Sequence, residues 1–456
     1  MKSWIPTLAD TGGPRYLELA EAIRADIEKG VLAPGDRLPP QRGVAKDIGL
    51  DVSTVSRGYS EAVRRGYVQS HVGRGTFVAP PVRDAPRVDP ARSRDEDPRM
   101  NMPPEPEDPE LVARMQAGFD YVSGNLVSLL RYQSVSGNER DRQIASNWMH
   151  ANGFETDLER LVISPGSHAS IHSILTLLAR PGDTILCEAV TYPGIRAITR
   201  SLHLGLAGVA MDEQGILPDA LERAIAEHKP AGLYLNPTLQ NPTTLTMPQA
   251  RRAQVAEVLR RTGVPLIEDD AYGFVAPDAP APISDALPGL GWHVLGVSKC
   301  FGAGLRLALT RVPDVSRMGP LTQVLRSTNV MASPVTLALF CRWIEDGTAL
   351  ALQSFIRTAA AARQRAAARI LQGCSYASAE TAFNIWLSLP EGTSRAALMG
   401  RMPNCTIGLM PSDAFTVAGP PAEALRVCLG GSISQSQLEA DLQTLRDAVQ
   451  RADWLG

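Results

Sequence analysis

Lys299 and Arg306 are a potential nucleophile and a potential anion-binding group, seven residues apart. Residues 293–295, His-Val-Leu, approach the lysine as an apolar run typical of a buried strand. A lysine desolvated at a strand end condenses with an aldehyde, and an arginine seven residues later offers a planar fork to a phosphate. Together they favour an anchor for pyridoxal phosphate; the plain alternative is a pair of surface cations.

The secondary structure around this pair belongs to the larger part of the chain. Strand-like runs at residues 161–163, 184–186, 232–235, 265–267 and 293–295 alternate with helix-like runs, of which 169–178 and 249–262 are the clearest. This alternation predicts an α/β fold with a mostly parallel sheet, whose ligands gather at the strand ends. Lys299 follows one of these strands, so we expect the site at that edge.

Length and composition restrict the class of protein. The chain has 456 residues, of which 44% are hydrophobic, enough for two or three domains. Its net charge of −3 argues against a polycation, although cations outnumber acids between residues 41 and 80. The six cysteines are scattered without a Cys-x-x-Cys pair, as in a reduced environment. No apolar stretch is long enough for a bilayer, so we expect a cytoplasmic protein without a membrane partner.

A proline-rich segment divides the chain. Residues 80–109 contain repeated prolines among charges and few large apolar residues, a composition that favours extended chain over a packed core. We therefore predict a small domain at residues 1–79, a linker at 80–109 and a large domain at 110–456.

The small domain has the pattern of a winged helix–turn–helix. Ala20, Ile23 and Ile27 mark one face of a helix that ends at Gly30. Shorter helical runs follow at residues 41–48 and 52–65, the second with Asp51 as its N-cap. Residues 67–68 and 76–78 then alternate like the strands of a hairpin. The order helix, helix, turn, helix, hairpin predicts this DNA-binding fold.

The same part of the chain resembles the GntR-type winged helix–turn–helix over residues 16–78. The resemblance rests on residues 38–42 (Leu-Pro-Pro-Gln-Arg), Gly49, residues 53–55 and residues 73–78 (Gly-Arg-Gly-Thr-Phe-Val). In that family the third helix enters the major groove and the wing reaches the minor groove, which implies a double-stranded operator DNA as partner. The implied contacts, whose hydroxyl and guanidinium groups suit phosphates and guanine, are Arg42, Ser53, Thr54, Arg57 and Arg74.

Four further stretches, together with Lys299, resemble the fold-type I aminotransferases from about residue 129 onward. They are residues 164–168 (Ser-Pro-Gly-Ser-His), 181–194, 241–243 (Asn-Pro-Thr) and 268–272 (Glu-Asp-Asp-Ala-Tyr). Free N–H groups where a helix begins bind phosphate, and a carboxylate keeps a pyridine nitrogen protonated. The resemblance implies a pyridoxal 5'-phosphate site formed by Lys299, Ser167, His168, Tyr192, Asn241, Asp269, Tyr272, Ser298 and Arg306.

Two more roles follow from the same resemblance. Arg426 matches the arginine that clamps the α-carboxylate of a substrate through a bidentate pair, with a structural ion pair as the alternative. Tyr132 resembles a tyrosine that reaches the phosphate of the cofactor in the neighbouring subunit. His168 and His172, four residues apart, could suggest zinc, but the glutamate of a metalloprotease motif does not follow His168. We therefore expect no metal.

The chain departs from both families at a few positions. Aminotransferases usually have Ser or Thr three residues before the lysine, where this chain has Gly296, so Ser298 is the candidate for the phosphate. The usual Asn-Pro-Thr-Gly ends here in Thr244. Near the turn of the DNA-binding domain, Asp51 and Val52 replace the Arg or Ser of many GntR relatives.

The whole arrangement resembles the MocR type of bacterial transcription regulator, whose members are dimeric. The resemblance implies that an amino-compound effector displaces Lys299 from its aldimine and that altered packing then moves the DNA-binding pair, a coupling of about 1–3 kcal/mol. The alternative is a working aminotransferase that the winged helix only localises, because sensing and transamination share this chemistry. A DNA-binding protein without cofactor would not need Lys299, Asp269 and Arg306 together.

Overall fold

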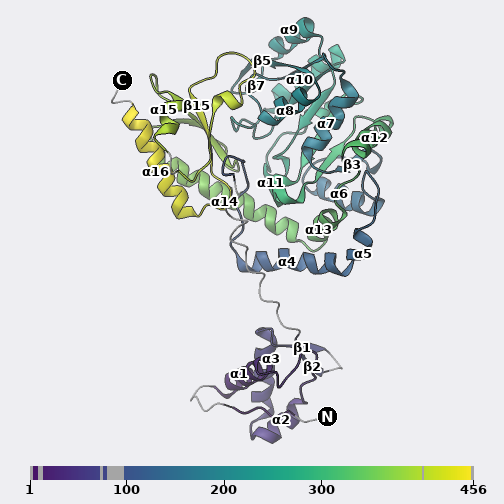
Figure 1. Ribbon diagram of the computed structural model, residues 1–456, viewed down its shortest axis with the longest axis vertical. Helices are drawn as coiled ribbons and strands as arrows, with labels where there is room; N and C mark the ends of the chain where they lie inside the picture. Colours follow the sequence, from purple (N-terminus) through teal and green to yellow (C-terminus); the bar gives the residue numbers. More distant parts are fainter. Residues whose placement is uncertain (1–3, 9–13, 72–74, 80–96, 403–404, 453–456) are drawn as a thin grey trace. The chain divides into compact units, whose positions relative to one another are not determined.

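The computed structural model describes residues 4–8, 14–71, 75–79, 97–402 and 405–452 (Figure 1). Contacts divide the chain into two compact units, Met1–Glu96 and Asp97–Gly456. The second unit begins earlier than the predicted linker ends, because Asn101, Pro103 and Pro104 are buried within it. Residues 97–109 therefore belong to the large unit and not to a linker.

The first unit is the winged helix–turn–helix expected from its pattern. It contains α1 (Arg15–Glu28), α2 (Gln41–Ile48), α3 (Val52–Arg64) and a hairpin of β1 (Val68–His71) with β2 (Gly75–Val78). Gly49 ends α2 in the left-handed conformation, with φ of 68°. A β-carbon at Gly58 would lie 2.8 Å from Leu19 Cδ2, so glycine lets α3 pack closely on α1. Tyr59 is buried in this core, and its hydroxyl donates to the Pro39 carbonyl.

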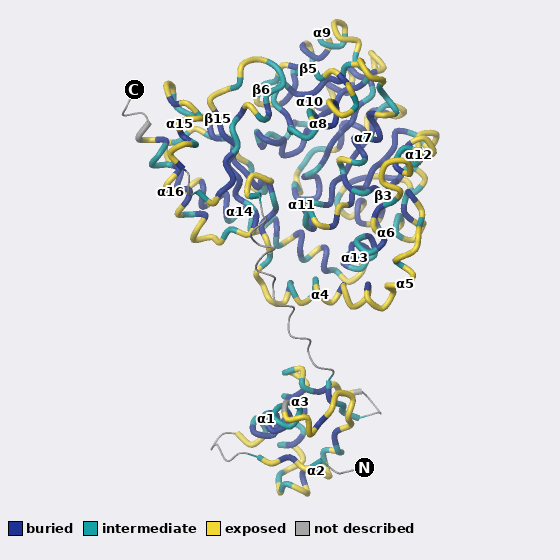
Figure 2. The backbone as a smooth tube through the Cα atoms, viewed as in Figure 1, coloured by how far each residue is buried: buried dark blue, intermediate teal, exposed yellow. Residues whose placement is uncertain are grey.

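A seven-stranded sheet forms the centre of the second unit, in the order β3-β11-β10-β9-β8-β4-β5. All neighbouring pairs from β10 to β5 are parallel, whereas β11 runs antiparallel to both of its neighbours. Six of these strands are almost entirely buried, whereas the edge strand β5 is largely accessible (Figure 2). Their bounds are β3 (Leu161–Ser164), β4 (Thr184–Glu188), β5 (Gly205–Val209), β8 (Gly232–Leu235), β9 (Leu266–Asp269), β10 (Gly291–Gly296) and β11 (Ala308–Arg311).

Most helices of this unit cover the main sheet, whereas α15 and α16 lie apart from it near the C-terminus (Figure 1). The runs predicted at residues 169–178 and 249–262 correspond to α7 and α10. The bounds are α4 (Pro109–Gly124), α5 (Leu126–Leu129), α6 (Glu139–Ala151), α7 (Ser167–Leu178), α8 (Pro193–Ser201), α9 (Pro218–His228), α10 (Gln249–Thr262), α11 (Ser298–Phe301), α12 (Met318–Thr328), α13 (Pro334–Glu345), α14 (Thr348–Ile370), α15 (Arg395–Gly400) and α16 (Gln435–Ala452). Among the described residues, no helix is long and apolar enough to cross a membrane.

A second, antiparallel sheet carries the C-terminal part of the chain. Its order is β12 (Ser375–Ala377), β13 (Asn384–Ser388), β15 (Ala424–Cys428) and β14 (Leu409–Pro411). One apolar cluster joins this sheet to α14 and α16. A separate short hairpin pairs β6 (Met211–Asp212) with β7 (Gly215–Ile216). Residues of β15 can thus face the edge of the main sheet, although they lie more than a hundred positions from Lys299 in the chain.

Candidate cofactor and effector site

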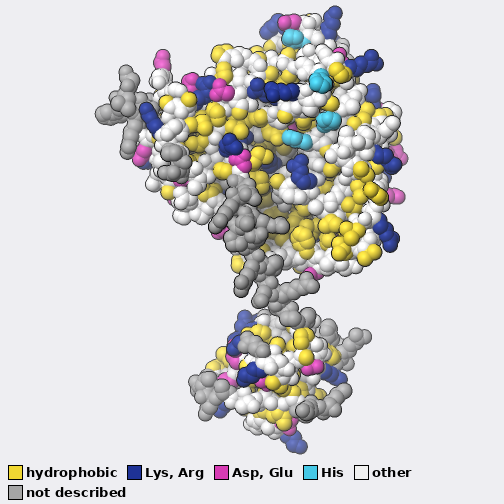
Figure 3. All heavy atoms as spheres, in the orientation of Figure 1, with side chains coloured by type: hydrophobic (Ala, Val, Ile, Leu, Met, Phe, Trp, Pro, Cys, Tyr) yellow, Lys and Arg dark blue, Asp and Glu magenta, His cyan; other side chains and the backbone are white. Residues whose placement is uncertain are grey.

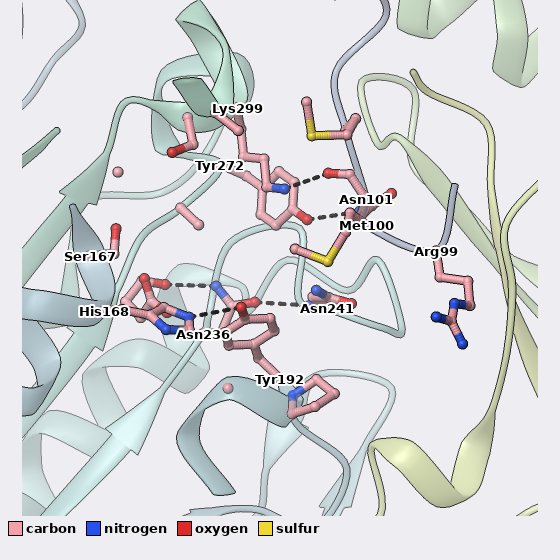
Figure 4. Close-up of a pocket in the computed structure, with 18 of the residues that line it drawn as sticks. Arg99, Met100, Asn101, Ser167, His168, Tyr192, Asn236, Asn241, Tyr272 and Lys299 are labelled. Atoms are coloured by element: carbon pink, nitrogen blue, oxygen red, sulfur yellow. Dashed lines mark hydrogen bonds between the residues drawn. The ribbon is translucent and has the colours of Figure 1, made fainter. Parts of the chain in front are cut away.

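A cavity of ≈ 250 Å³ lies within the second unit. Its walls come from the ends of the main strands, from the first turn of α7, from β14 and β15, and from residues 99–102 (Figure 4). The predicted cofactor residues Ser167, His168, Tyr192, Asn241, Asp269, Tyr272, Ser298, Lys299 and Arg306 all line it, as does Arg426. Tyr132 does not; its side chain is 87% exposed elsewhere on the surface.

Lys299 reaches the cavity from α11, directly after β10 ends. Its Nζ donates a hydrogen bond to the main-chain carbonyl of Asn101 and lies 5.9 Å from the centre of the Tyr272 ring. Burial, reinforced by the positive charge of Arg426, lowers the pKa of Lys299 to about 8. The fraction of neutral amine near neutral pH is therefore larger than for an ordinary lysine, which suits a nucleophile.

Asp269 ends β9 and presents one unpaired oxygen. Its Oδ2 accepts a hydrogen bond of 2.7 Å from the Tyr234 hydroxyl, while its buried Oδ1 has no partner among the described residues. Burial raises the pKa of Asp269 to about 6. A buried acceptor without a donor is costly, and a protonated ring nitrogen would satisfy it. The carboxylate thus fits the pyridinium partner that the sequence predicts.

Another part of the cavity wall is suited to a phosphate. Ser167 begins α7, whose first N–H groups have no partner inside the helix. Gly166, with φ of 102°, allows the Arg306 Nη2 to approach to 3.3 Å of where a β-carbon would be. A β-carbon at Gly296 would lie only 2.6 Å from the Ser167 Oγ. Gly296, which stands where aminotransferases usually have Ser or Thr, therefore leaves space for the Ser167 hydroxyl. Ser167 and Ser298 both lie in the cavity wall.

Thr244, the second departure from the aminotransferase pattern, has a left-handed backbone with φ of 64°. Glycine adopts this conformation freely, whereas a β-branched residue is strained there, which explains why the motif usually ends in glycine. The backbone N–H of Thr244 donates to the Gln240 carbonyl at 2.7 Å, and the residue is buried. The tight turn is therefore kept, and Asn241 stays in the cavity wall.

Arg426 extends from the middle of β15 and is buried. Its Nη1 donates to the Asn241 Oδ1 at 2.9 Å, its Nη2 donates to the carbonyl of Arg99, and its Nε has no partner among the described residues. Both recorded partners are neutral oxygens, so the described residues hold it without the structural ion pair considered as an alternative. Met410 pairs with Arg426 across the strands and also lines the cavity.

Two asparagines of the site were missed by the sequence reasoning. Asn101 is 4% exposed, and its Nδ2 donates to the Tyr272 hydroxyl at 2.8 Å and to the Asn384 Oδ1 at 2.9 Å. Asn236 donates to the Asp269 carbonyl at 2.6 Å and accepts from the Asn241 N–H. The Asn-Pro pair at residues 236–237, just before the one at 241–242, was a signal for Asn236. No sequence pattern marked Asn101, because it lies in the proline-rich stretch that indicated a linker.

The predicted DNA contacts lie in the first unit, around α2 and α3. Arg42 and Ser53 are exposed and Thr54 is half-buried. The Arg57 guanidinium stacks 4.2 Å from the centre of the Tyr16 ring, which fixes its direction. Further along α3, Arg64 and Arg65 pair with Glu61, as expected for a solvated helix end. Arg74 lies outside the described residues.

Comparison with known families matches both units. Residues 107–445 match the model of class I and II aminotransferases, and residues 15–78 match the bacterial regulatory proteins of the gntR family. The chain belongs to the class I and II aminotransferase family. With its GntR domain, this family member has the architecture of a MocR-type transcription regulator.

Relatives that span both units are regulators. The HTH-type transcriptional regulator YdeF of Bacillus subtilis is 27% identical over 97% of this chain and 96% of its own. YjiR of Escherichia coli, also an HTH-type transcriptional regulator, is 25% identical over 96% of this chain and 99% of its own. These relatives extend the likeness beyond the aminotransferase fold to the complete two-domain chain.

Solved structures share the fold of the large unit. The α-aminoadipate aminotransferase LysN of Thermus thermophilus, complexed with N-(5'-phosphopyridoxyl)-L-leucine, is 21% identical with a TM-score of 0.68, over 78% of this chain and 92% of that one. The kynurenine aminotransferase of Pyrococcus horikoshii is 19% identical with a TM-score of 0.70, and the match covers 79% of this chain and 93% of that one. The fold-type I architecture predicted from the motifs is confirmed.

Proposed function

We propose that this chain is a transcription regulator that holds pyridoxal 5'-phosphate in its large unit and senses an amino acid there. The unpaired Oδ1 of the buried Asp269 carries the cofactor assignment, because it lies in the same cavity as Lys299 and the phosphate-binding end. When bound, the cofactor would supply an aldehyde that condenses reversibly with primary amines and a ring that accepts electrons. The GntR unit would direct the response to operator DNA.

The residues of the cavity would divide the work of binding. Asp269 would hold the proton of the ring nitrogen, and Ser167, Ser298 and Arg306 would hold the phosphate. Arg426 would take the carboxylate of the effector, with the effector's amine next to Lys299. A guanidinium can bind both oxygens of a carboxylate at once, which favours an amino acid over a simple amine.

A homodimer would complete the site through Tyr132. Exposed apolar side chains gather along α4, α5 and the residues that follow (Figure 3). They include Phe119, Val127, which is 74% exposed, and Leu130, which is 71% exposed. A contiguous apolar surface of this kind is typical of a protein interface. A second copy would cover it and carry Tyr132 toward the phosphate of the neighbouring subunit.

The alternative function is transamination, with the DNA-binding unit only localising the enzyme. A concrete test measures both outputs in the full-length protein loaded with pyridoxal phosphate. The affinity for DNA that flanks the encoding gene is measured with each of the twenty amino acids, next to release of keto acid. We expect one or more amino acids to change DNA affinity by about 5–150-fold. Turnover of about 1 per second or faster with unchanged DNA binding would instead establish the enzyme.

A further inference from the structure

Residues 99–102, which we call the strap, line the cavity together with Lys299 and Arg426 (Figure 4). The Arg99 carbonyl accepts from the Arg426 Nη2, and the Asn101 carbonyl accepts from the Lys299 Nζ. The two cationic groups assigned to the effector's carboxylate and amine thus both bind main-chain oxygens of one short segment. That segment begins three residues after the first unit ends at Glu96.

The strap is built into the second unit by close contacts. A β-carbon at Gly430 would lie 1.7 Å from the Met102 carbonyl oxygen, and one at Gly408 would lie 1.9 Å from the Pro98 carbonyl oxygen. Only glycine at these two positions lets the chain lie so near. The Gly431 N–H donates to the Pro103 carbonyl at 3.1 Å. These contacts, made by Met102 and by the flanking residues Pro98 and Pro103, hold the strap in a defined position.

The bonds of the strap to Arg426 are weaker than those an amino acid could make. Arg99 offers one neutral carbonyl oxygen, and the Nε of Arg426 is left unpaired. A carboxylate would bring two oxygens and a negative charge, and charge-assisted bidentate bonds to a guanidinium are stronger than bonds to a neutral acceptor. A ligand with a carboxylate can therefore displace the Arg99 carbonyl, whereas an amine without one cannot.

We propose that the strap competes with the effector's carboxylate for Arg426, and that its release carries occupancy of the site into the chain leading to the DNA-binding unit. This inference rests on the proposed sensing function. It makes Asn101 a positioning residue: its side chain, bonded to Tyr272 and Asn384, keeps the strap seated until a carboxylate displaces it. The effector class is then an α-amino carboxylate.

The test uses Asn101→Ala in the full-length protein loaded with pyridoxal phosphate, without ligand. Hydrogen exchange of peptides that cover residues 97–102 should become at least about tenfold faster, and DNA affinity should shift in the direction that the responding amino acid produces in the wild type. Glu107→Gln, an exposed position outside the cavity wall, is the matched control and should change neither quantity. Arg426→Ala removes the hydrogen bond to the Arg99 carbonyl and should also speed this exchange. The proposal can therefore be tested even if Asn101→Ala does not fold.

A second arm uses the wild type with the responding amino acid and with the amine that lacks its carboxylate. The amino acid should speed exchange at residues 97–102, and the amine should leave it unchanged. If the amino acid changes DNA affinity while exchange of the strap stays slow, or if the released strap of Asn101→Ala leaves DNA affinity unaltered, the strap inference is overturned and sensing stands. If no amino acid changes DNA affinity in the wild type, the proposed function itself fails.

Discussion

The two units use charged residues in opposite ways. In the first unit, the predicted DNA contacts Arg42 and Arg57 are exposed on helices, where water and salt weaken each interaction. In the second, Asp269 and Arg426 are almost completely buried, and burial shifts the pKa of Asp269 upward and that of Lys299 downward. An exposed contact contributes a small part of the free energy of DNA binding. A buried charged group instead controls the chemistry of the cavity around it. The difference predicts unequal responses to substitution.

The largest expected effect is that of Lys299→Ala. The variant should lose all visible absorbance that arises from attachment of the cofactor to the lysine, because no other described lysine lines the cavity. Folding should persist, since ring and phosphate contacts come from other residues; circular dichroism checks this. Lys46→Ala, at an exposed position of the first unit, should leave the absorbance unaltered. Equal loss in both variants would contradict the assignment of the site.

Asp269→Asn should have the next largest effect. The amide keeps the shape but removes the charge that would hold a ring proton, a charged hydrogen bond of about 1.5–3 kcal/mol. Affinity for pyridoxal phosphate should fall by about 10–150-fold, as measured by titration of the cofactor-free protein. Asp219→Asn, at an exposed position of α9 away from the cavity, serves as the control. Unchanged cofactor affinity in Asp269→Asn would remove the main support for the proposed cofactor.

The buried lysine should also leave a signature in the pH dependence of stability. The pKa of Lys299 is lowered from 10.5 to about 8 in the folded protein, so between these values the unfolded chain binds more protons. Its contribution to the unfolding free energy of the cofactor-free protein should therefore rise with pH across this window. Lys299→Met should flatten that rise, as measured by denaturant unfolding between pH 7.5 and about 10.5. An identical slope in the variant would show that the lysine is not desolvated.

The smallest effect is expected at the exposed DNA contacts. Arg42→Ala should weaken DNA binding by about tenfold, corresponding to one charged hydrogen bond of about 1.5 kcal/mol. The slope of log affinity against log salt should fall by about 0.9. Arg64→Ala, whose guanidinium pairs with Glu61, should change both quantities less. If Arg64→Ala has the larger effect, the predicted docking face of α2 and α3 is wrong.

Local sequence determined much of both units. Gly49 ends α2 where predicted, and Asp51 occupies the N-cap of α3, although its side chain makes no capping bond. The five predicted strands of the large unit are all present, because short apolar runs between polar turns leave few alternatives. The missed β5, Gly-Leu-Ala-Gly-Val, has too many small residues to read as a strand. The site residues that directly follow a strand could be predicted, because each lies within a short contiguous motif.

Tertiary structure alone decided how the distant parts of the site meet. The second sheet brings Arg426 to Asn241, 185 positions earlier in the chain. The proline-rich stretch was read as linker because proline favours extended chain and offers no core-forming pattern. The same extended chain has carbonyl oxygens free to accept bonds, and in the fold those of Arg99 and Asn101 lie against Arg426 and Lys299. Main-chain acceptors are the same at every residue, so no sequence pattern can mark which of them a folded site will use.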